Sequence, residues 1–201
     1  MAIIDSPNPN DSQRAFFACC CDSALSEALH KQIGEMEARL KFGLRRPPAG
    51  SHHVTLCFVP ALPSASISGI WREIQLFPAD GPIPFTLGPV EALTRQDRCR
   101  LLLRRVELKH ERVAALQRHI ELSIRRVCAG IELRLPTQYH ITVARISAYV
   151  SRAVCKSALS RGGVAEAESN VAGGVFQKLS LIRSELTPSG PIYSTLHERE
   201  L

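Results

Sequence analysis

The chain has 201 residues, with 25 lysines and arginines against 19 acidic residues, so its net charge is +6 when the histidines are neutral. A composition of 45% hydrophobic and 22% charged residues is typical of a globular protein with a core, and it excludes a disordered or low-complexity chain. No apolar run approaches the roughly 18 residues of a membrane-spanning helix, and the first residues lack the apolar stretch of a secretory signal. We therefore expect a cytoplasmic protein with no membrane partner.

The seven cysteines, at positions 19, 20, 21, 57, 99, 128 and 155, include three in a row and no C-x-x-C pair. Such spacing suits neither a disulfide framework nor a zinc site, so we expect small buried thiols in a reducing compartment and no bound metal. The glycine patterns of nucleotide-binding folds are missing from the sequence as well. No cofactor is predicted.

The N-terminal segment is rich in Pro, Asn and Ser, which predicts a disordered arm over residues 1–13. Residues 14–201 are long enough for one domain, or for two intimately joined lobes. We expect this part to form a single domain of two intertwined lobes.

The first predicted strand covers residues 15–20, which are apolar and aromatic. Asp22 or Ser23 then caps a helix whose apolar residues recur at helical spacing, and Gly43 is placed to end it in a left-handed cap. After a turn with two arginines and two prolines, the sequence HHVTLCF, residues 52–58, is typical of a strand. The first half of the chain thus predicts strand, helix, strand.

The second half repeats this plan, with a strand at 100–106, a helix at 113–127 and a strand in YHITVARI, residues 139–146. An offset of 87 residues relates Leu29 to Leu116, Ile33 to Ile120, Leu40 to Val127, Gly43 to Gly130, His53 to His140 and Thr55 to Thr142. Two unrelated strand–helix–strand units would share the same spacing of apolar residues, but the matching glycines, histidines and threonines favour an internal duplication.

The remaining elements complete an α+β pattern. They are a short helix near 66–77, a strand at 85–93, a short helix at 151–159, a loop at 161–174, and strands at 175–186 and 192–200 joined by the turn sequence TPSGP. Strands separated by helices, with hairpin-length joins at the end, predict antiparallel sheets rather than a doubly wound parallel one.

Two His-x-Thr sequences carry the candidate chemistry. Residues i and i+2 of a strand point to one face, so His53 with Thr55, and His140 with Thr142, each present an imidazole beside a hydroxyl. If the duplicated halves face one another across a pseudo-twofold axis, both pairs converge on one cleft. Imidazoles with pKa values near 6.5 can hold opposite protonation states at neutral pH, as a general base and a general acid must.

Chance is a weak alternative to this interpretation. By chance, two H-x-T sequences arise in roughly one protein in forty of this composition. In such a protein the histidines would be ordinary half-buried residues of strands. Their equivalent places in a duplicated unit favour a shared site, in which in-line phosphoryl chemistry would use one His as base, the other as acid and the threonine hydroxyls as phosphate donors.

The sequences HHVTLCF and HITVAR resemble the paired motifs of the two-histidine phosphoesterase superfamily, in particular its RNA 2′,3′-cyclic phosphodiesterase family, also called 2′-5′ RNA ligases. RAFFACC, RCRLLLRRV and LSLIRSELTPSGPIYSTLHEREL are similar to further strands of that family, so the resemblance covers nearly the whole chain. It implies a bilobal α+β fold in which two pseudo-twofold-related antiparallel sheets with outer helices enclose a central groove.

The resemblance also implies an activity in RNA processing, the metal- and ATP-independent opening of a terminal 2′,3′-cyclic phosphate to a 2′-phosphate, with reversible 2′-5′ RNA ligation. By motif position, His53 would be the proton donor to the leaving oxygen and His140 the proton acceptor. Thr55 and Thr142 would bind phosphate oxygens, and Arg145 matches a phosphate-binding arginine. An offset of five places Arg145 on the opposite face from His140 in a regular strand, unless the strand bends.

The sequence departs from the family at Tyr139, at Pro60 and at the pair Ser51-His52, none of which belongs to the His and Thr positions. Phe58 is a candidate for stacking on a base, with core packing as its alternative. The segment 95–112 holds seven basic and three acidic residues, and it is either a solvated strand edge and helix start or part of a positive path for RNA.

The expected partner is RNA with 2′,3′-cyclic phosphate ends, tRNA fragments included, bound by a monomer. Two other functions stay open at this point. One is a cyclic phosphodiesterase acting on a small nucleotide or ADP-ribose cyclic phosphate, and the other is a non-catalytic nucleotide- or RNA-binding module. Intact His and Thr at both motifs argue against the module, since a binder does not need two proton-transfer groups.

Overall fold

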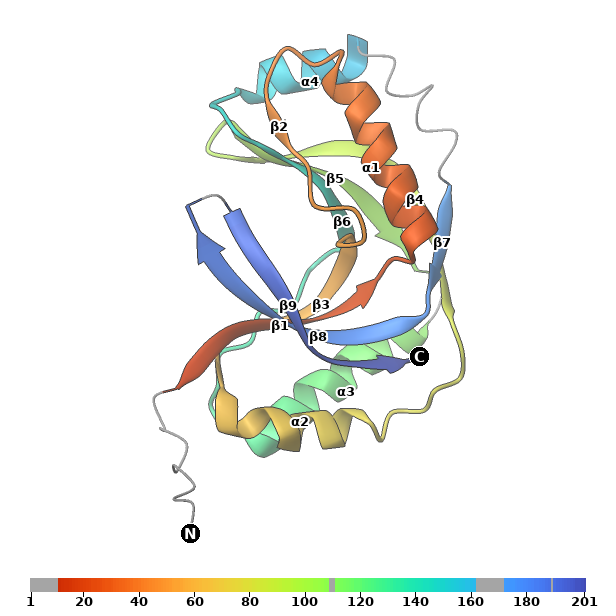
Figure 1. Ribbon diagram of the computed structural model, residues 1–201, viewed down its shortest axis with the longest axis vertical. Coiled ribbons are helices and arrows are strands. Elements are labelled where there is room, and N and C mark those ends of the chain that lie inside the picture. Colours follow the sequence, from red (N-terminus) through yellow and green to blue (C-terminus); the bar gives the residue numbers. More distant parts are fainter. Residues whose placement is uncertain (1–10, 109–110, 162–171, 189) are drawn as a thin grey trace.

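A computed structural model of the protein describes residues 11–108, 111–161, 172–188 and 190–201. The elements in chain order are β1 (Ser12–Cys20), α1 (Ser23–Glu37), β2 (Leu44–Arg45), β3 (His53–Pro63), the 3₁₀ turn η1 (Ser64–Ser66), α2 (Ile67–Ile74), β4 (Ile83–Arg95), β5 (Arg98–Glu107), α3 (Glu111–Val127), β6 (His140–Ile146), α4 (Arg152–Arg161), β7 (Gly173–Phe176), β8 (Lys178–Thr187) and β9 (Gly190–Glu200). This arrangement confirms the α+β class (Figure 1).

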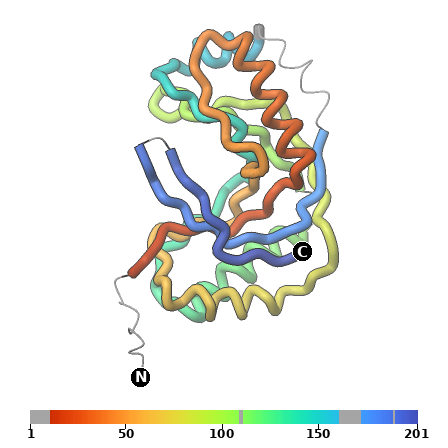
Figure 2. The backbone as a smooth tube through the Cα atoms, viewed as in Figure 1, coloured from red at the N-terminus to blue at the C-terminus, as the bar shows by residue number. Residues whose placement is uncertain are grey.

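The strands of the described residues form one curled antiparallel sheet in the order β7-β4-β5-β6-β3-β1-β8-β9, with β2 paired to β6. The two separate sheets that we expected are therefore joined into one. The joint is narrow, because β3 and β6 pair only through Val54 and Ile141, whereas every other neighbouring pair shares a longer ladder or a second residue pair. Two half-sheets thus meet at one residue pair, and Figure 2 traces the backbone through both of them.

The helices cross between the two half-sheets. Helix α1 follows β1 of one half-sheet but packs against β6 of the other, and α3 follows β5 but packs against β3. Figure 1 shows α1 and α4 beside β4, β5 and β6, and α2 and α3 beside β1 and β3. The helices cover one face of each half-sheet, and the apolar core lies between helix and sheet.

The α1 helix begins where we predicted and ends earlier. The Asp22 side chain accepts a hydrogen bond of 2.7 Å from the Leu25 amide, which is an N-cap contact. The helix ends at Glu37, so Gly43 is not its cap. Gly43 instead lies against β6, where an added Cβ would stand 2.7 Å from the hydroxyl oxygen of Ser147. The glycine permits a close approach of two segments rather than a left-handed turn.

Two of the three duplicated apolar pairs are buried alike in both halves, whereas Leu40 is 7% exposed and its counterpart Val127 is 38% exposed. Leu29 and Ile33 of α1, and their 87-residue counterparts Leu116 and Ile120 of α3, are all 0% exposed. Gly43 and Gly130, which the 87-residue offset also relates, differ in backbone conformation. Gly130 has a φ of 77°, whereas Gly43 does not have a positive φ. The apolar stripe is therefore the better evidence for equivalent halves.

Several predicted boundaries differ from the structure. Strand β1 begins at Ser12, so residues 12 and 13 of the predicted arm belong to a strand, and residues 1–10 of that arm lie outside the described residues. The predicted strand 175–186 is divided between β7 and β8, and residues 162–171 of the predicted loop are also outside the description. Within the described segments, no helix is long and apolar enough to cross a membrane.

Candidate active site

The two His-x-Thr sequences lie side by side where the half-sheets meet. Val54 and Ile141 form the joining pair and are both fully buried, so the residues that flank them point to the opposite face. His53, Thr55, His140 and Thr142 are all half-buried on that face. Continuing the antiparallel register by one residue in each direction places His53 opposite Thr142 and Thr55 opposite His140. The four side chains are related by a local twofold axis through the joining pair.

Both histidines are oriented in the same way. The Nδ1 atom of His53 lies 2.8 Å from the carbonyl oxygen of Ser51, and that of His140 lies 3.3 Å from the carbonyl oxygen of Gln138. A carbonyl only accepts, so Nδ1 carries the hydrogen and donates in each ring. The Nε2 atom of each imidazole is then the nitrogen that could exchange a proton with a bound molecule.

His53 is the more enclosed of the two histidines. Its ring stacks on Phe16, with centroids 4.9 Å apart, and meets the edge of Tyr193 at 5.6 Å. Burial lowers the pKa of His53, the Ser51 carbonyl opposes this shift, and the positive charges of His140 and Arg145 lower the pKa further. A proton on His140 therefore disfavours a proton on His53.

A β-bulge brings Arg145 to the face of the histidines. In the β5–β6 ladder, Leu103 pairs with Thr142 but Leu102 pairs with Ala144, which leaves Val143 as an extra residue. Val143 and Ala144 are both buried, and Arg145 is exposed on the side of His140 and Thr142. The bulge therefore places Arg145 on the same face as His140, although an offset of five residues in a regular strand would place it on the opposite face.

Strand β3 has the same irregularity at the equivalent place. Phe17 pairs with Cys57 and Ala18 with Thr55, so Leu56 is the extra residue, and it precedes Val143 by the same 87 residues. Phe58 is the counterpart of Arg145 and lies on the groove face, where it packs with Phe16 and Tyr193. The Arg14 guanidinium lies 4.4 Å from the centroid of the Phe58 ring. Base stacking by Phe58 stays a prediction.

One side chain of α3 connects the two motifs, which the sequence did not reveal. Gln117 donates a hydrogen bond of 2.8 Å to the carbonyl oxygen of Leu56, the bulged residue of β3. Its amide oxygen accepts one of 2.7 Å from the hydroxyl of Tyr139, which directly precedes His140. Tyr139, a departure from the family pattern, thus has a structural partner.

A hollow of about 350 Å³ lies beside His140 on the groove face, within the usual range of small-molecule sites. It is lined by Glu91 and Leu93 of β4, Leu103 and Arg105 of β5, the segment 135–139 and His140 itself. Arg105 and Glu91 form an ion pair of 2.9 Å at its wall. The hollow offers apolar and polar contacts to a ligand that reaches His140.

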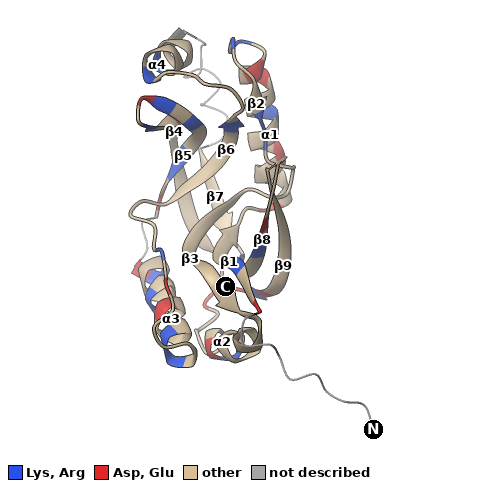
Figure 3. Ribbon diagram, turned by 90° about the vertical axis from the view of Figure 1, so that its left-hand side faces the viewer, with Lys and Arg blue, Asp and Glu red and all other residues tan. Residues whose placement is uncertain are grey.

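The basic segment 95–112 does not form one charged surface. Arg104 is 2% exposed and donates to the carbonyl oxygen of Gly88 at 2.7 Å. Arg105 pairs with Glu91, and Arg112 donates to the carbonyl oxygen of Gly81, while Lys109 lies outside the described residues. Figure 3 shows the Lys and Arg positions distributed over several elements. Three of its basic residues are therefore engaged within the protein, and a role of the segment in binding RNA stays a prediction.

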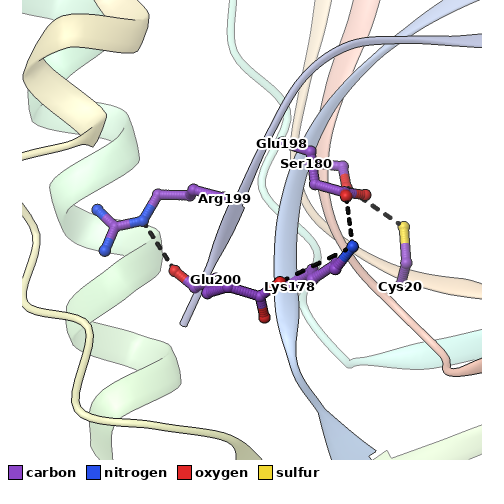
Figure 4. A network of polar contacts seen from close by, with 6 residues as sticks. All are labelled: Cys20, Lys178, Ser180, Glu198, Arg199 and Glu200. Carbon is purple, nitrogen blue, oxygen red and sulfur yellow. Dashed lines mark hydrogen bonds and ion pairs between the residues drawn. The ribbon is translucent and has the colours of Figure 1, made fainter.

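A polar network lies on the groove face beside His53. Cys20 of β1 pairs with His53 in the sheet, and its thiol lies 3.6 Å from the Ser180 hydroxyl. That hydroxyl lies 3.3 Å from a Glu198 carboxylate oxygen, and the same carboxylate binds Lys178 at 2.7 Å (Figure 4). Burial raises the pKa of Cys20, so the thiol stays protonated at neutral pH.

The remaining predicted features are placed as follows. His52 is 1% exposed and packed in the protein, with Nδ1 2.7 Å from the Ser26 hydroxyl, so it points away from the groove. Five of the seven cysteines are buried, and all are free thiols. In the part of the chain that the structure describes, no three His, Cys, Asp or Glu side chains are grouped to hold a metal ion.

No family model matches this chain, and no curated protein matches its sequence. Solved structures do match its fold. TT0787 of Thermus thermophilus has a TM-score of 0.69 and 20% identity, covering 94% of this chain and 97% of that one. E. coli LigT complexed with 3′-AMP has a TM-score of 0.65 and 18% identity, with 95% and 99% covered.

A structure described as a phosphoesterase has a TM-score of 0.62 and 16% identity, covering 94% of this chain and 98% of that one. At these identities the likeness establishes the fold alone. The chain has the fold of LigT and of this phosphoesterase, which confirms the α+β fold that the resemblance to two-histidine phosphoesterases implied.

Proposed function

We propose that the protein is a two-histidine phosphoesterase that hydrolyses the terminal 2′,3′-cyclic phosphate of RNA to a 2′-phosphate. The observation that carries this proposal is the pair His53 and His140, held by equivalent carbonyl contacts on one face of adjoining strands. The fold shared with a phosphoesterase and with LigT, which was solved with 3′-AMP and with phosphate, supports the same class of substrate.

The reaction is an in-line displacement at phosphorus. His140 Nε2 accepts a proton from water as the new P–O bond forms, and His53 Nε2 donates a proton to O3′ as the P–O3′ bond breaks. The ring of each histidine is fixed through Nδ1, so Nε2 is directed to the groove without rotation. When the 5′-hydroxyl of an RNA end replaces water, the same proton transfers produce a 2′-5′ linkage.

The phosphate is held by groups that stand on both strands. Thr55 and Thr142 donate hydroxyl hydrogens to the non-bridging oxygens from opposite sides of the local twofold axis. Arg145, brought to this face by the bulge, supplies a positive charge to the phosphate. The dianionic charge that develops in the transition state is stabilised by donors that are already in place.

Product analysis tests the proposal. Purified, chelator-treated protein is incubated with an oligoribonucleotide that ends in a 2′,3′-cyclic phosphate, and the product is identified by mass and by its sensitivity to enzymes specific for 2′- or 3′-phosphates. A 2′-phosphate is expected, with loss of turnover by at least about a hundredfold in His53→Ala and in His140→Ala.

His119→Ala is the matched control, because the His119 ring binds the Glu73 carbonyl on α2 and lies outside the groove. This variant should keep its turnover. A 3′-phosphate product would contradict O3′ as the leaving group, and turnover only with small cyclic nucleotides would contradict the RNA assignment. No turnover of any cyclic phosphate would contradict the enzymatic assignment.

A further inference from the structure

The hollow beside His140 has walls on the same face of the sheet as the two motifs. Leu103 of β5 lies opposite Thr142 of β6, and Arg105 lies opposite His140. Glu91 of β4 lies opposite Leu103. Directly paired residues of a sheet point to one face, so these side chains stand beside the motif residues. A molecule in the hollow therefore touches His140 and lies next to the phosphate site.

Apolar side chains gather around this hollow. Leu93 is 47% exposed and Leu135 is 40% exposed, and both line the hollow together with Leu103, which is 6% exposed. Exposed apolar side chains at a concave place mark a ligand site, because a ligand that covers them removes their surface from water. The hollow therefore favours a ligand with an apolar face.

The charges at the wall of the hollow compensate each other. The Nε atom of Arg105 lies 2.9 Å from both carboxylate oxygens of Glu91, so this pair is neutral as a unit. Thr137 and Gln138 line the hollow, are exposed, and add a hydroxyl and an amide that donate and accept hydrogen bonds. The lining thus suits an uncharged ligand with polar edges, and a nucleoside is such a molecule.

The reaction geometry puts the hollow on the side of the attacking group. An in-line displacement at phosphorus places the attacking and leaving oxygens on opposite sides. In the proposed reaction the leaving O3′ faces His53, so the nucleoside that carries the cyclic phosphate belongs to the His53 side. The rings of Phe16 and Tyr193 pack against His53, whereas His140, which takes the proton of the attacking hydroxyl, borders the hollow.

We propose that the hollow binds the 5′-terminal nucleoside of an acceptor RNA, whose 5′-hydroxyl attacks the cyclic phosphate in place of water. This inference rests on the proposed function and gives its ligation reaction a second substrate site. The O5′ proton moves to His140 Nε2 as the P–O5′ bond forms, and His53 Nε2 gives its proton to O3′ as the P–O3′ bond breaks. The products are a 2′-5′ phosphodiester and a free 3′-hydroxyl, and no nucleoside triphosphate is consumed.

The ratio of ligation to hydrolysis tests the proposal. The protein is incubated with adenosine 2′,3′-cyclic phosphate and increasing adenosine, and the 2′-5′-linked ApA and the adenosine 2′-phosphate are quantified. Both products arise from the same cyclic phosphate and the same two histidines, so their ratio reports on the acceptor. In the wild type the ratio should rise with the adenosine concentration.

The double variant Leu93→Ala/Leu135→Ala removes apolar surface from the hollow. Each methylene group that a ligand covers contributes about fourfold to affinity, so this variant should lower the ratio by about tenfold or more. Leu122→Ala is the matched control, because Leu122 is 54% exposed but lies on α3 and does not line the hollow. It should keep the ratio of the wild type. An unchanged ratio in the double variant overturns the proposal.

A longer substrate distinguishes the acceptor from the strand that carries the cyclic phosphate. If the hollow held the preceding nucleotide of that strand, the double variant would lower kcat/KM for ApA ending in a 2′,3′-cyclic phosphate far more than for adenosine 2′,3′-cyclic phosphate. This result overturns the proposal. Equal ratios of variant to wild type for the two substrates, together with the lost ligation, support it.

A binding experiment separates this proposal from the proposed function. Adenosine is titrated into the wild type and the double variant while the ring signals of His140 are followed by NMR, which requires no turnover. Saturable shifts in the wild type and weaker binding in the double variant support a nucleoside site in the hollow, even in a protein that hydrolyses no cyclic phosphate. Absence of shifts in the wild type, or equal affinity of both proteins, overturns it.

Discussion

Removing the proposed general acid should matter only when the leaving group needs a proton. His53→Ala deletes the imidazole that we propose donates a proton to O3′, whereas His140→Ala deletes the proposed acceptor of the proton from water. A substrate with sulfur in place of O3′ has a thiolate leaving group, with a thiol pKa near 8.5, which departs without a proton. We expect His53→Ala to be active on this sulfur substrate and His140→Ala to be inactive on both substrates.

The expected magnitudes separate chemistry from folding. A general acid contributes about a hundredfold to ten-thousandfold, or roughly 3 to 5.5 kcal/mol at 1.36 kcal/mol per factor of ten. The His53 ring makes two aromatic contacts, at 4.9 Å to Phe16 and 5.6 Å to Tyr193, each worth about 0.5–1.5 kcal/mol. His53→Ala should therefore lose about 1–3 kcal/mol of unfolding free energy and remain folded, since small domains have about 5–15 kcal/mol.

The assay compares kcat/KM of the wild type and both variants on the oxygen and sulfur substrates at pH 7, with the melting temperature as the measure of folding. For His53→Ala the loss should be at least about a hundredfold on oxygen and less than about tenfold on sulfur. Equal losses of His53→Ala on both substrates would refute its role as the acid. Selective rescue of His140→Ala by sulfur would reverse the two roles.

Two further predictions follow from the same geometry. Thr55→Val and Thr142→Val should each lower kcat/KM about 10- to 100-fold, which is the value of a hydrogen bond to a charged phosphate. Thr86→Val is the control, because Thr86 lies on β4 and contacts Glu107 at 3.5 Å, and it should leave turnover unchanged. Equal rates in all three variants would contradict the phosphate contacts. Burial, then the charges of His30 and His53, lowers the pKa of His52 to about 4. In the unfolded chain the pKa of this histidine is near 6.5, so the unfolding free energy should fall by about 3 kcal/mol between pH 6.5 and 4. Urea titrations should find that His52→Gln lacks this decrease. The same decrease in the variant would exclude His52 as its source.

The sequence predicted the parts of the fold that depend on local pattern. The Asp22 cap, the apolar stripes of α1 and α3 and the strands that carry the two motifs follow from spacing alone. The end of α1 did not follow, because Gly43 was taken for a helix cap although its small size serves contact with Ser147. The role of Gly43 depends on Ser147, which is over a hundred positions away, so no local stretch of sequence could predict it.

The candidate site was predicted in its residues but not in its geometry. Alternation in a strand placed His53 with Thr55 and His140 with Thr142, yet it put Arg145 on the wrong face. The bulge at Val143 corrects this face, and a bulge depends on pairing with β5 rather than on the residues of β6. Gln117 was missed for a similar reason, since it contacts both motif strands from a helix that is distant in sequence.

The crossing of α1 and α3 makes each half of the protein depend on the other for protection from water. Each helix follows a strand of one half-sheet and buries its apolar stripe on the other, so neither half-sheet can unfold without exposing a helix that belongs to its neighbour. The walls of the groove are interlocked, and separating them would pull a helix from its packing. The two half-sheets are therefore coupled to each other through their helices as well as through the pair Val54 and Ile141.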